Sequence, residues 1–160
     1  MIASWDMFLV TTIGRTIMGL LTALMLGFVG YLFWSALFPP MLAGLTVQTF
    51  TVVITMAAVV TLGTSIAWFK LEAEWKTRFV AIAIIATGAF IGGWIGYDYG
   101  FDKGVAEIVK EYGHIPGGQL RVPTLDGIRW SLIAGSVAAN AMAVSHHVWR
   151  LLRYHDPYDY

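Results

Sequence analysis

The sequence predicts an all-α integral membrane protein with four transmembrane helices. Two observations predict this class. The chain is 58% hydrophobic and 12% charged, whereas a soluble domain carries about a quarter of its residues as Asp, Glu, Lys and Arg. Residues 16–69 contain none of these four residue types. A bilayer crossing needs about 20 apolar residues, so this uncharged stretch has room for two crossings.

Four apolar runs are long enough to cross a bilayer as helices. We predict the spans at 16–38, 46–69, 79–97 and 130–151. The links between them are a Pro39-Pro40 turn, a charged loop at 70–78 and a polar connector at 98–129. None of the runs alternates as a strand does, and each must satisfy its own backbone in lipid, which favours helices. We expect a single transmembrane domain over residues 1–160.

The distribution of charge predicts the orientation of the chain. With four spans, both termini and the 70–78 loop lie on one side of the membrane. That side carries Arg15, Lys70, Lys76, Arg78, Arg150 and Arg153. The other side balances Lys103, Lys110, Arg121 and Arg129 with Asp98, Asp102, Glu107, Glu111 and Asp126. The more positive side faces the cytoplasm, so we predict cytoplasmic termini in a plasma or inner membrane, or in an equivalent energy-transducing membrane.

The connector begins with a segment that is typical of a helix. Residues 105–112 place their apolar side chains on one helical face. The third helix is therefore predicted to extend beyond the bilayer to about Tyr112 and to end at Gly113. The following Pro- and Gly-rich residues predict a loop, with Thr124 or Asp126 capping the start of the fourth helix.

Glycines recur at every fourth position of GAFIGGWIGYDYGFDKG. They are Gly88, Gly92, Gly96, Gly100 and Gly104. A helical glycine costs about 1 kcal/mol relative to alanine, but small residues at this spacing let helices approach closely in lipid. The pattern predicts a helix-packing row of the glycine-zipper type. For Gly100 and Gly104, local turns at the neighbouring aspartates are an equal alternative.

Two other predicted spans carry similar rows of small residues. The first span has Gly19, Ala23 and Gly27, and the fourth has Gly135, Ala139 and Ala143 in step with Ser131. A small bundle needs only one or two such rows to hold itself together. We therefore expect at least one row to face another protein chain; the alternative is that all three rows face the inside of the bundle.

His146 and His147 are the candidate ligands for a tetrapyrrole such as haem or a pigment. A bis-histidine haem needs a second histidine, which the first three spans lack, although Met18 could complete a His/Met pair. A chlorophyll-type pigment needs one ligand, and residues 143–149 resemble the histidine region of bacterial light-harvesting polypeptides. Those polypeptides cross the membrane once, so no family is assigned. The alternative is that both histidines lie at the headgroup level beside Trp149.

The sequence predicts a protein that is not an enzyme on its own. It contains no cysteine for a thiolate metal site, and no Walker loop, HExxH, GxSxG or pair of acids. Its net charge of zero gives no basis for binding nucleic acid. We predict a non-catalytic accessory or structural subunit of a larger membrane complex, with membrane subunits and lipids as partners. The alternatives are a pigment- or haem-binding subunit of an electron-transfer or light-harvesting complex, and a homo-oligomeric pore or carrier.

Overall fold

The computed structural model describes residues 2–37, 45–69, 75–115 and 120–154, and within these ranges the chain is all-helical. The helices are α1 (Ile2–Leu37), α2 (Leu45–Trp68), α3 (Trp75–Tyr112) and α4 (Arg121–Tyr154). The predicted all-α class is confirmed. The turn at Pro39-Pro40 and most of the 70–78 loop lie outside the described residues.

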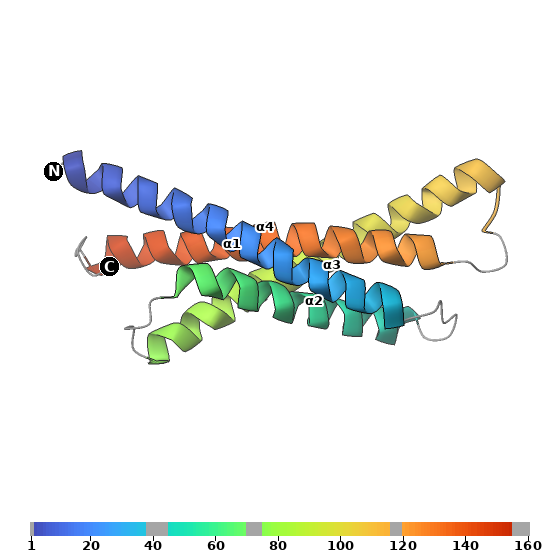
Figure 1. Ribbon diagram of the computed structural model, residues 1–160, viewed down its shortest axis with the longest axis horizontal. Helices are drawn as coiled ribbons and strands as arrows, with labels where there is room; N and C mark the ends of the chain where they lie inside the picture. Colours follow the sequence, from blue (N-terminus) through green and yellow to red (C-terminus); the bar gives the residue numbers. More distant parts are fainter. Residues whose placement is uncertain (1, 38–44, 70–74, 116–119, 155–160) are drawn as a thin grey trace.

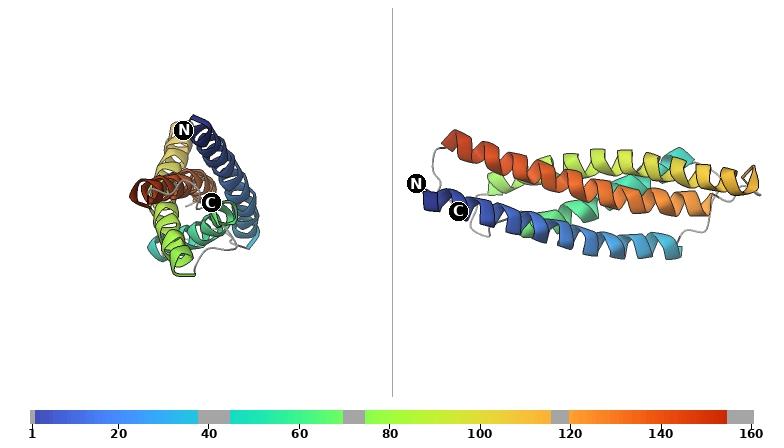
Figure 2. Two further views of the ribbon diagram at one scale, coloured as in Figure 1. Left: turned by 90° about the vertical axis from the view of Figure 1, so that its left-hand side faces the viewer. Right: turned by 90° about the horizontal axis from the view of Figure 1, so that it is seen from above.

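The four helices form an elongated bundle in which consecutive helices run in opposite directions (Figure 1). The start of α1 and the end of α4 lie at the same end of the molecule. The most extensive contact is between α3 and α4, followed by that between α1 and α2. Both α1 and α3 contact α2 and α4, so α1 and α3 occupy opposite corners of the bundle (Figure 2).

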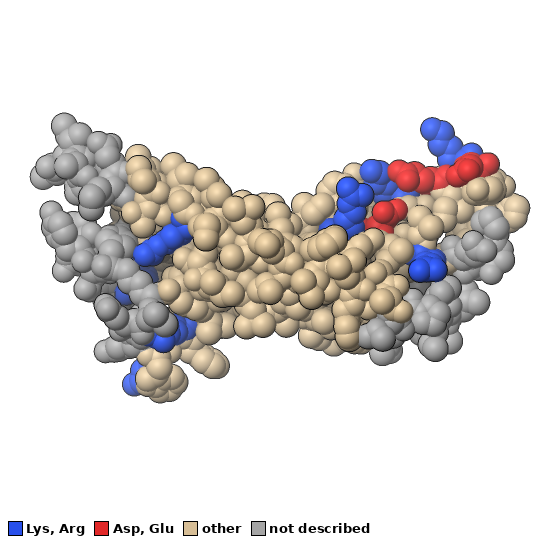
Figure 3. Space-filling view, in the orientation of Figure 1, with Lys and Arg blue, Asp and Glu red and all other residues tan. Residues whose placement is uncertain are grey.

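Three of the helices are long and apolar enough to cross a membrane. These segments are Phe8–Ala36, Thr49–Trp68 and Trp75–Tyr112. Figure 3 shows the matching surface: on the face in view, the middle of the molecule is free of charged side chains, and the described Lys, Arg, Asp and Glu gather at the ends. The chain therefore has the character of a membrane protein. The helix α4 is more polar, because serine, asparagine and histidine interrupt its apolar residues.

Helix boundaries differ from the predicted spans mainly at the amino-terminal ends. The helix α4 begins at Arg121, so the prediction that Thr124 or Asp126 caps it is wrong. The backbone N–H of Thr124 already donates to the carbonyl oxygen of Leu120 at 3.0 Å, as in a helix. Pro123 is compatible with this position, because the first turn of a helix leaves its N–H groups without partners inside the helix.

The carboxyl end of α3 agrees with the sequence-based boundary. The helix ends at Tyr112, and Gly113 follows with φ of 73°. This left-handed conformation is the usual glycine stop of a helix. The N–H of Gly113 donates to the carbonyl oxygen of Val109 at 2.8 Å, which satisfies one of the carbonyls that the last turn would otherwise leave unpaired.

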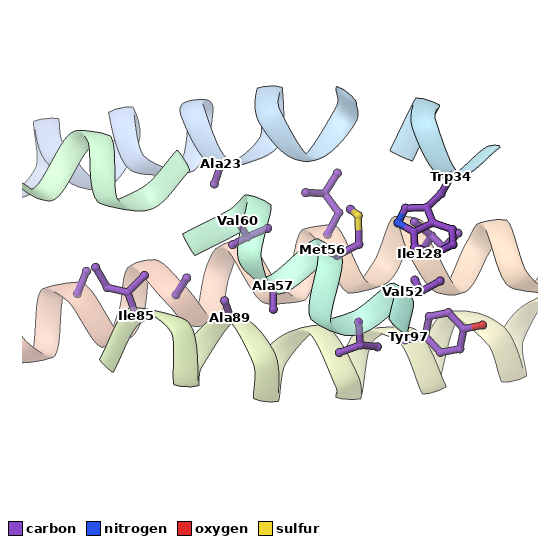
Figure 4. Packing of buried hydrophobic residues seen from close by; sticks show 14 residues of the cluster. Ala23, Trp34, Val52, Met56, Ala57, Val60, Ile85, Ala89, Tyr97 and Ile128 are labelled. Atoms are coloured by element: carbon purple, nitrogen blue, oxygen red, sulfur yellow. The ribbon is translucent and has the colours of Figure 1, made fainter. Parts of the chain in front are cut away.

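The core is a narrow seam between the four helices, and many of its side chains are small (Figure 4). Its alanines are Ala23, Ala57, Ala89, Ala139 and Ala143. Larger side chains such as Met56 of α2 and Trp34 of α1 are also buried in the seam. Small residues bring the helix backbones close together, so dispersion contacts between them hold the bundle.

Candidate helix-packing interface

The glycine row of α3 lies against the backbone of α4. Facing pairs are Gly88 with Ala138, Gly92 with Ala134, Gly96 with Trp130, and Gly100 with Asp126. In each pair, a Cβ added to the glycine would meet the carbonyl oxygen of its partner, at 2.5–2.8 Å for Gly88, Gly92 and Gly100. Real Cβ atoms essentially never approach so closely. The partners on α4 are also four residues apart, in descending order, as antiparallel helices require.

The row continues beyond the apolar part of α3 because α4 continues beside it. Gly100 and Gly104 both lie within α3, so the alternative of local turns does not apply. A Cβ on Gly104 would lie 2.7 Å from the Cα of Pro123, in the first turn of α4. The early start of α4 at Arg121 thus supplies the surface that these two glycines contact.

The facing side of α4 is also made of small residues. A Cβ on Gly135 would lie 3.1 Å from the carbonyl oxygen of Ala89. Ala139 and Ala143 are buried, with 0% and 4% of their surface exposed. The Ser131 hydroxyl oxygen would lie 3.2 Å from a Cβ on Gly93. The α3–α4 contact therefore has small residues on both helices, which allows the backbones to approach closely between residues 88–104 of α3 and 123–138 of α4.

The small-residue row of α1 contacts two other helices. A Cβ added to Gly19 would meet the side chain of Asn140, and one added to Gly27 would meet Leu132, both on α4. Ala23 lies against α2, because a Cβ on Gly63 would be 2.6 Å from the Ala23 Cα.

Gly63 was not among the residues that sequence reasoning singled out. The available signal was a lone glycine inside an apolar helical run. Its neighbour across the contact, Thr22, donates its hydroxyl to the Gly63 carbonyl oxygen at 2.6 Å. Gly63 therefore provides both a close approach of α2 to α1 and an interhelical hydrogen bond.

All three rows of small residues meet helices of the same chain. In the part of the chain that the structure describes, none of them is left as an open surface. The expectation that at least one row faces another chain gains no support from this arrangement. Large apolar side chains, not the glycines, form the outer surface of the bundle.

A buried polar cluster around Asn140 connects α2 to α4. The Asn140 side chain is 2% exposed and donates from Nδ2 to the Ser136 carbonyl oxygen at 2.9 Å and to the Thr64 hydroxyl at 3.4 Å. Its Oδ1 accepts a bond from the Trp68 indole nitrogen at 3.2 Å. Buried polar groups in a membrane need internal partners, and this cluster supplies them across the helix contact.

The two histidines of α4 have different surroundings. The ring of His147 lies 5.6 Å from the rings of both Phe8 and Trp68, stacked on the former and edge-on to the latter. His147 is thus part of an aromatic cluster among α1, α2 and α4. His146 lines a groove between α3 and α4, with its ring 6.3 Å from that of Trp149.

The groove beside His146 has a volume of about 400 Å³ and is open to the outside. Its other lining residues are Val80, Ile84, Met142, Ser145 and Trp149. Met18, the possible second haem ligand, lies on α1 with 55% of its surface exposed. Among the described residues, no cluster of three His, Asp or Glu side chains is placed to hold a metal ion.

Comparison with known protein families, curated proteins and solved structures finds no match for this chain.

Proposed function

We propose that this chain is a non-catalytic accessory or structural subunit of a larger membrane protein complex. The observation that carries the proposal is the exposure of α1. Its candidate crossing is 17% buried, against 50% for that of α2, and Val10, Met25 and Val29 each expose more than 60% of their surface. The helix contacts its own bundle through a narrow row of small residues. Its broad apolar side is available to helices of another protein.

The polar side chains within the bundle support a structural role. Asn140 is engaged with Thr64 and Trp68, and Thr22 with Gly63. These bonds connect helices to one another. The glycine and alanine rows contribute by holding the bundle together, so that α1 presents a fixed outer face. Docking would then use the large apolar side chains of α1, together with polar contacts from residues 98–129 at one end of the bundle.

Site-specific photocrosslinking in the native membrane tests this proposal. A photoreactive residue at Met25 or Val29 should give one discrete protein adduct, and that protein should co-purify in a fixed ratio in mild detergent. The matched control is Ile91, which is 52% exposed on α3 and should give no such adduct. A chain that crosslinks only to lipid and purifies alone would overturn the proposal. A homo-oligomer that conducts ions in liposomes would support the pore or carrier instead.

We further propose that α4 is a fourth crossing and that the start of α1 and the end of α4 face the cytoplasm or its equivalent. The close packing of α4 against α3 supports a fourth crossing, and the positive-inside rule supports the orientation. The chain has no cysteine, so single cysteines can report on it. An impermeant maleimide should label Lys110→Cys in intact cells, and Lys76→Cys only after permeabilisation. The opposite labelling pattern would show that the chain has the inverted topology.

A pigment- or haem-binding subunit is the second candidate, and the groove beside His146 is the observation that favours it. An apolar groove could hold part of a tetrapyrrole, and the imidazole beside it could serve as the single axial ligand. The rings of Phe8 and Trp68 pack on His147, so His146 is the better placed ligand. A purified complex with a visible absorption band that His146→Ala removes and His147→Ala retains would support this function. A colourless complex would exclude it.

A further inference from the structure

We propose that the groove between the start of α3 and the end of α4 binds an acyl chain of an anionic phospholipid, with the lipid phosphate held by cations at the end of the groove. This inference is independent of the accessory-subunit proposal, because it concerns a surface on the α3–α4 side of the bundle. Its volume of about 400 Å³ falls within the ~300–1,000 Å³ range of small-ligand sites.

The walls of the groove are apolar. Val80 and Ile84 form the α3 side, and Met142 and Trp149 belong to the α4 side. The one hydroxyl in the lining, that of Ser145, donates to the carbonyl oxygen of Ala141 in its own helix at 2.8 Å. An acyl chain in the groove would therefore make dispersion contacts with its walls. It would not bury a hydroxyl group that lacks a hydrogen-bond partner.

The helix on each side of the groove carries a cationic residue beyond the lining residues, and the two cations lie at the same end of the molecule. Lys76, Val80 and Ile84 are four residues apart on α3, so they share one face of the helix. On α4, Met142, His146 and Arg150 share a face for the same reason. The two helices are antiparallel, so Lys76 and Arg150 both lie at the end where α3 begins and α4 finishes.

The charge at this end of the groove is complementary to a phosphate. Lys76 and Arg150 are exposed, and Figure 3 shows described Lys and Arg, without described Asp or Glu, at this end on the face in view. The acids of the preceding loop, Glu72 and Glu74, lie outside the described residues, and Asp6 belongs to the first turns of α1 at this same end, with a side chain that the structure does not describe. Trp149, which is half exposed in the groove, is a residue type that favours the headgroup level. An acyl chain in the groove would thus have its phosphate at the end of the molecule where Lys76 and Arg150 lie.

Quenching of Trp149 by lipids with brominated acyl chains tests the proposal in the full-length chain. The chain is placed in phosphatidylcholine nanodiscs with increasing amounts of brominated phosphatidylglycerol. The Trp149 signal is taken as the difference between the natural chain and Trp149→Phe. We expect quenching at mole fractions of brominated phosphatidylglycerol at which brominated phosphatidylcholine has no effect. Equal quenching by the two lipids would overturn the proposal.

Charge variants test whether the anionic lipid is attracted to this end of the two helices rather than to the opposite end. Each Lys or Arg near a membrane surface contributes about a five-fold gain in binding to anionic lipid, so Lys76→Gln with Arg150→Gln should raise the half-saturating mole fraction about 30-fold. The control pair, Lys110→Gln with Arg121→Gln, removes exposed cations from the opposite ends of the same helices and should leave it unchanged. Equal effects of the two pairs of substitutions would overturn the site. A visible absorption band of the purified chain that is lost in His146→Ala would also overturn it, because a pigment or haem would then occupy the groove.

Discussion

Gly96 of α3 lies against the carbonyl oxygen of Trp130 on α4, closer than any side chain would permit. Three more glycines of the row, at positions 88, 92 and 100, repeat this relationship with carbonyl oxygens of α4. Glycine Cα–H groups at such contacts form weak hydrogen bonds to carbonyl oxygens across helices. These bonds and the backbone dispersion contacts offset the low helix propensity of glycine. The α3–α4 pair is therefore held by backbone contact between residues 88–104 of α3 and 123–138 of α4.

Replacing Gly96 with alanine should destabilise the bundle. The added methyl group would collide with the Trp130 carbonyl, and overpacking of this kind costs about 1–3 kcal/mol. Thermal unfolding in mild detergent, followed by circular dichroism, measures the change. Gly14→Ala is the matched control, because a Cβ at that position would have no described atom within 4 Å apart from its chain neighbours and the adjacent backbone of α1. The control should be neutral or slightly stabilising, since alanine is the better helix former. Equal shifts in both variants would refute the contact.

Replacing Gly104 with valine should separate the end of α3 from the start of α4. The new side chain would meet the backbone of Pro123, while the apolar part of the bundle keeps its contacts. Trypsin should then cleave after Lys103 and Lys110 more rapidly than in the natural chain. Ala106→Val, at an exposed position of the same segment, should leave the cleavage rate unchanged. Similar rates in the two variants would show that the end of α3 does not depend on this contact.

The spacing of the glycines predicted a packing row, but not the surface that it meets. A four-residue repeat indicates that one face of a helix is bare. It carries no information on which of three other helices lies there. The start of α4 was placed too late because Pro123, Thr124 and Gly127 are typical of a loop. A proline in the first turn of a helix is allowed, and here the contact between Gly104 and Pro123 stabilises that turn.

The contacts of Gly63 and Asn140 could not be predicted from the sequence. Gly63 has a small residue, Ala67, at only one of its two four-residue steps on α2, because Val59 at the other step is bulky, and so it does not form a row of three. Asn140 is one polar residue among several in α4, and its partner Trp68 is 72 residues away along the chain. Both contacts depend on how three helices are arranged around one another. Local patterns identify helices and bare faces, and the tertiary arrangement decides the pairs.

Replacing Gly63 with valine should loosen α1 from the bundle. A side chain there would meet the Ala23 backbone at 2.6 Å and would displace the hydroxyl of Thr22 from the Gly63 carbonyl. Because α1 has few other buried contacts, its amides should exchange with deuterium faster, while those of α3 and α4 keep their protection. Ala58→Val, at an exposed position of α2, is the control and should leave exchange in α1 unaltered. Uniformly faster exchange would indicate general destabilisation.

Replacing Asn140 with leucine should weaken the contact between α2 and α4. The substitution removes the acceptor of the Trp68 indole and the donor to the Thr64 hydroxyl, and it adds apolar bulk beside Gly19. Interhelical hydrogen bonds in membranes contribute about 0.6 kcal/mol on average and up to about 1.7 kcal/mol. A double-mutant cycle of Asn140→Leu with Trp68→Phe, measured by unfolding in detergent, should give a coupling energy in this range. Pairing Asn140→Leu with Ser145→Ala, whose hydroxyl bonds only within α4, should give a coupling near zero. If both cycles gave the same coupling, the bond between Trp68 and Asn140 would contribute nothing specific to the packing of α2 on α4.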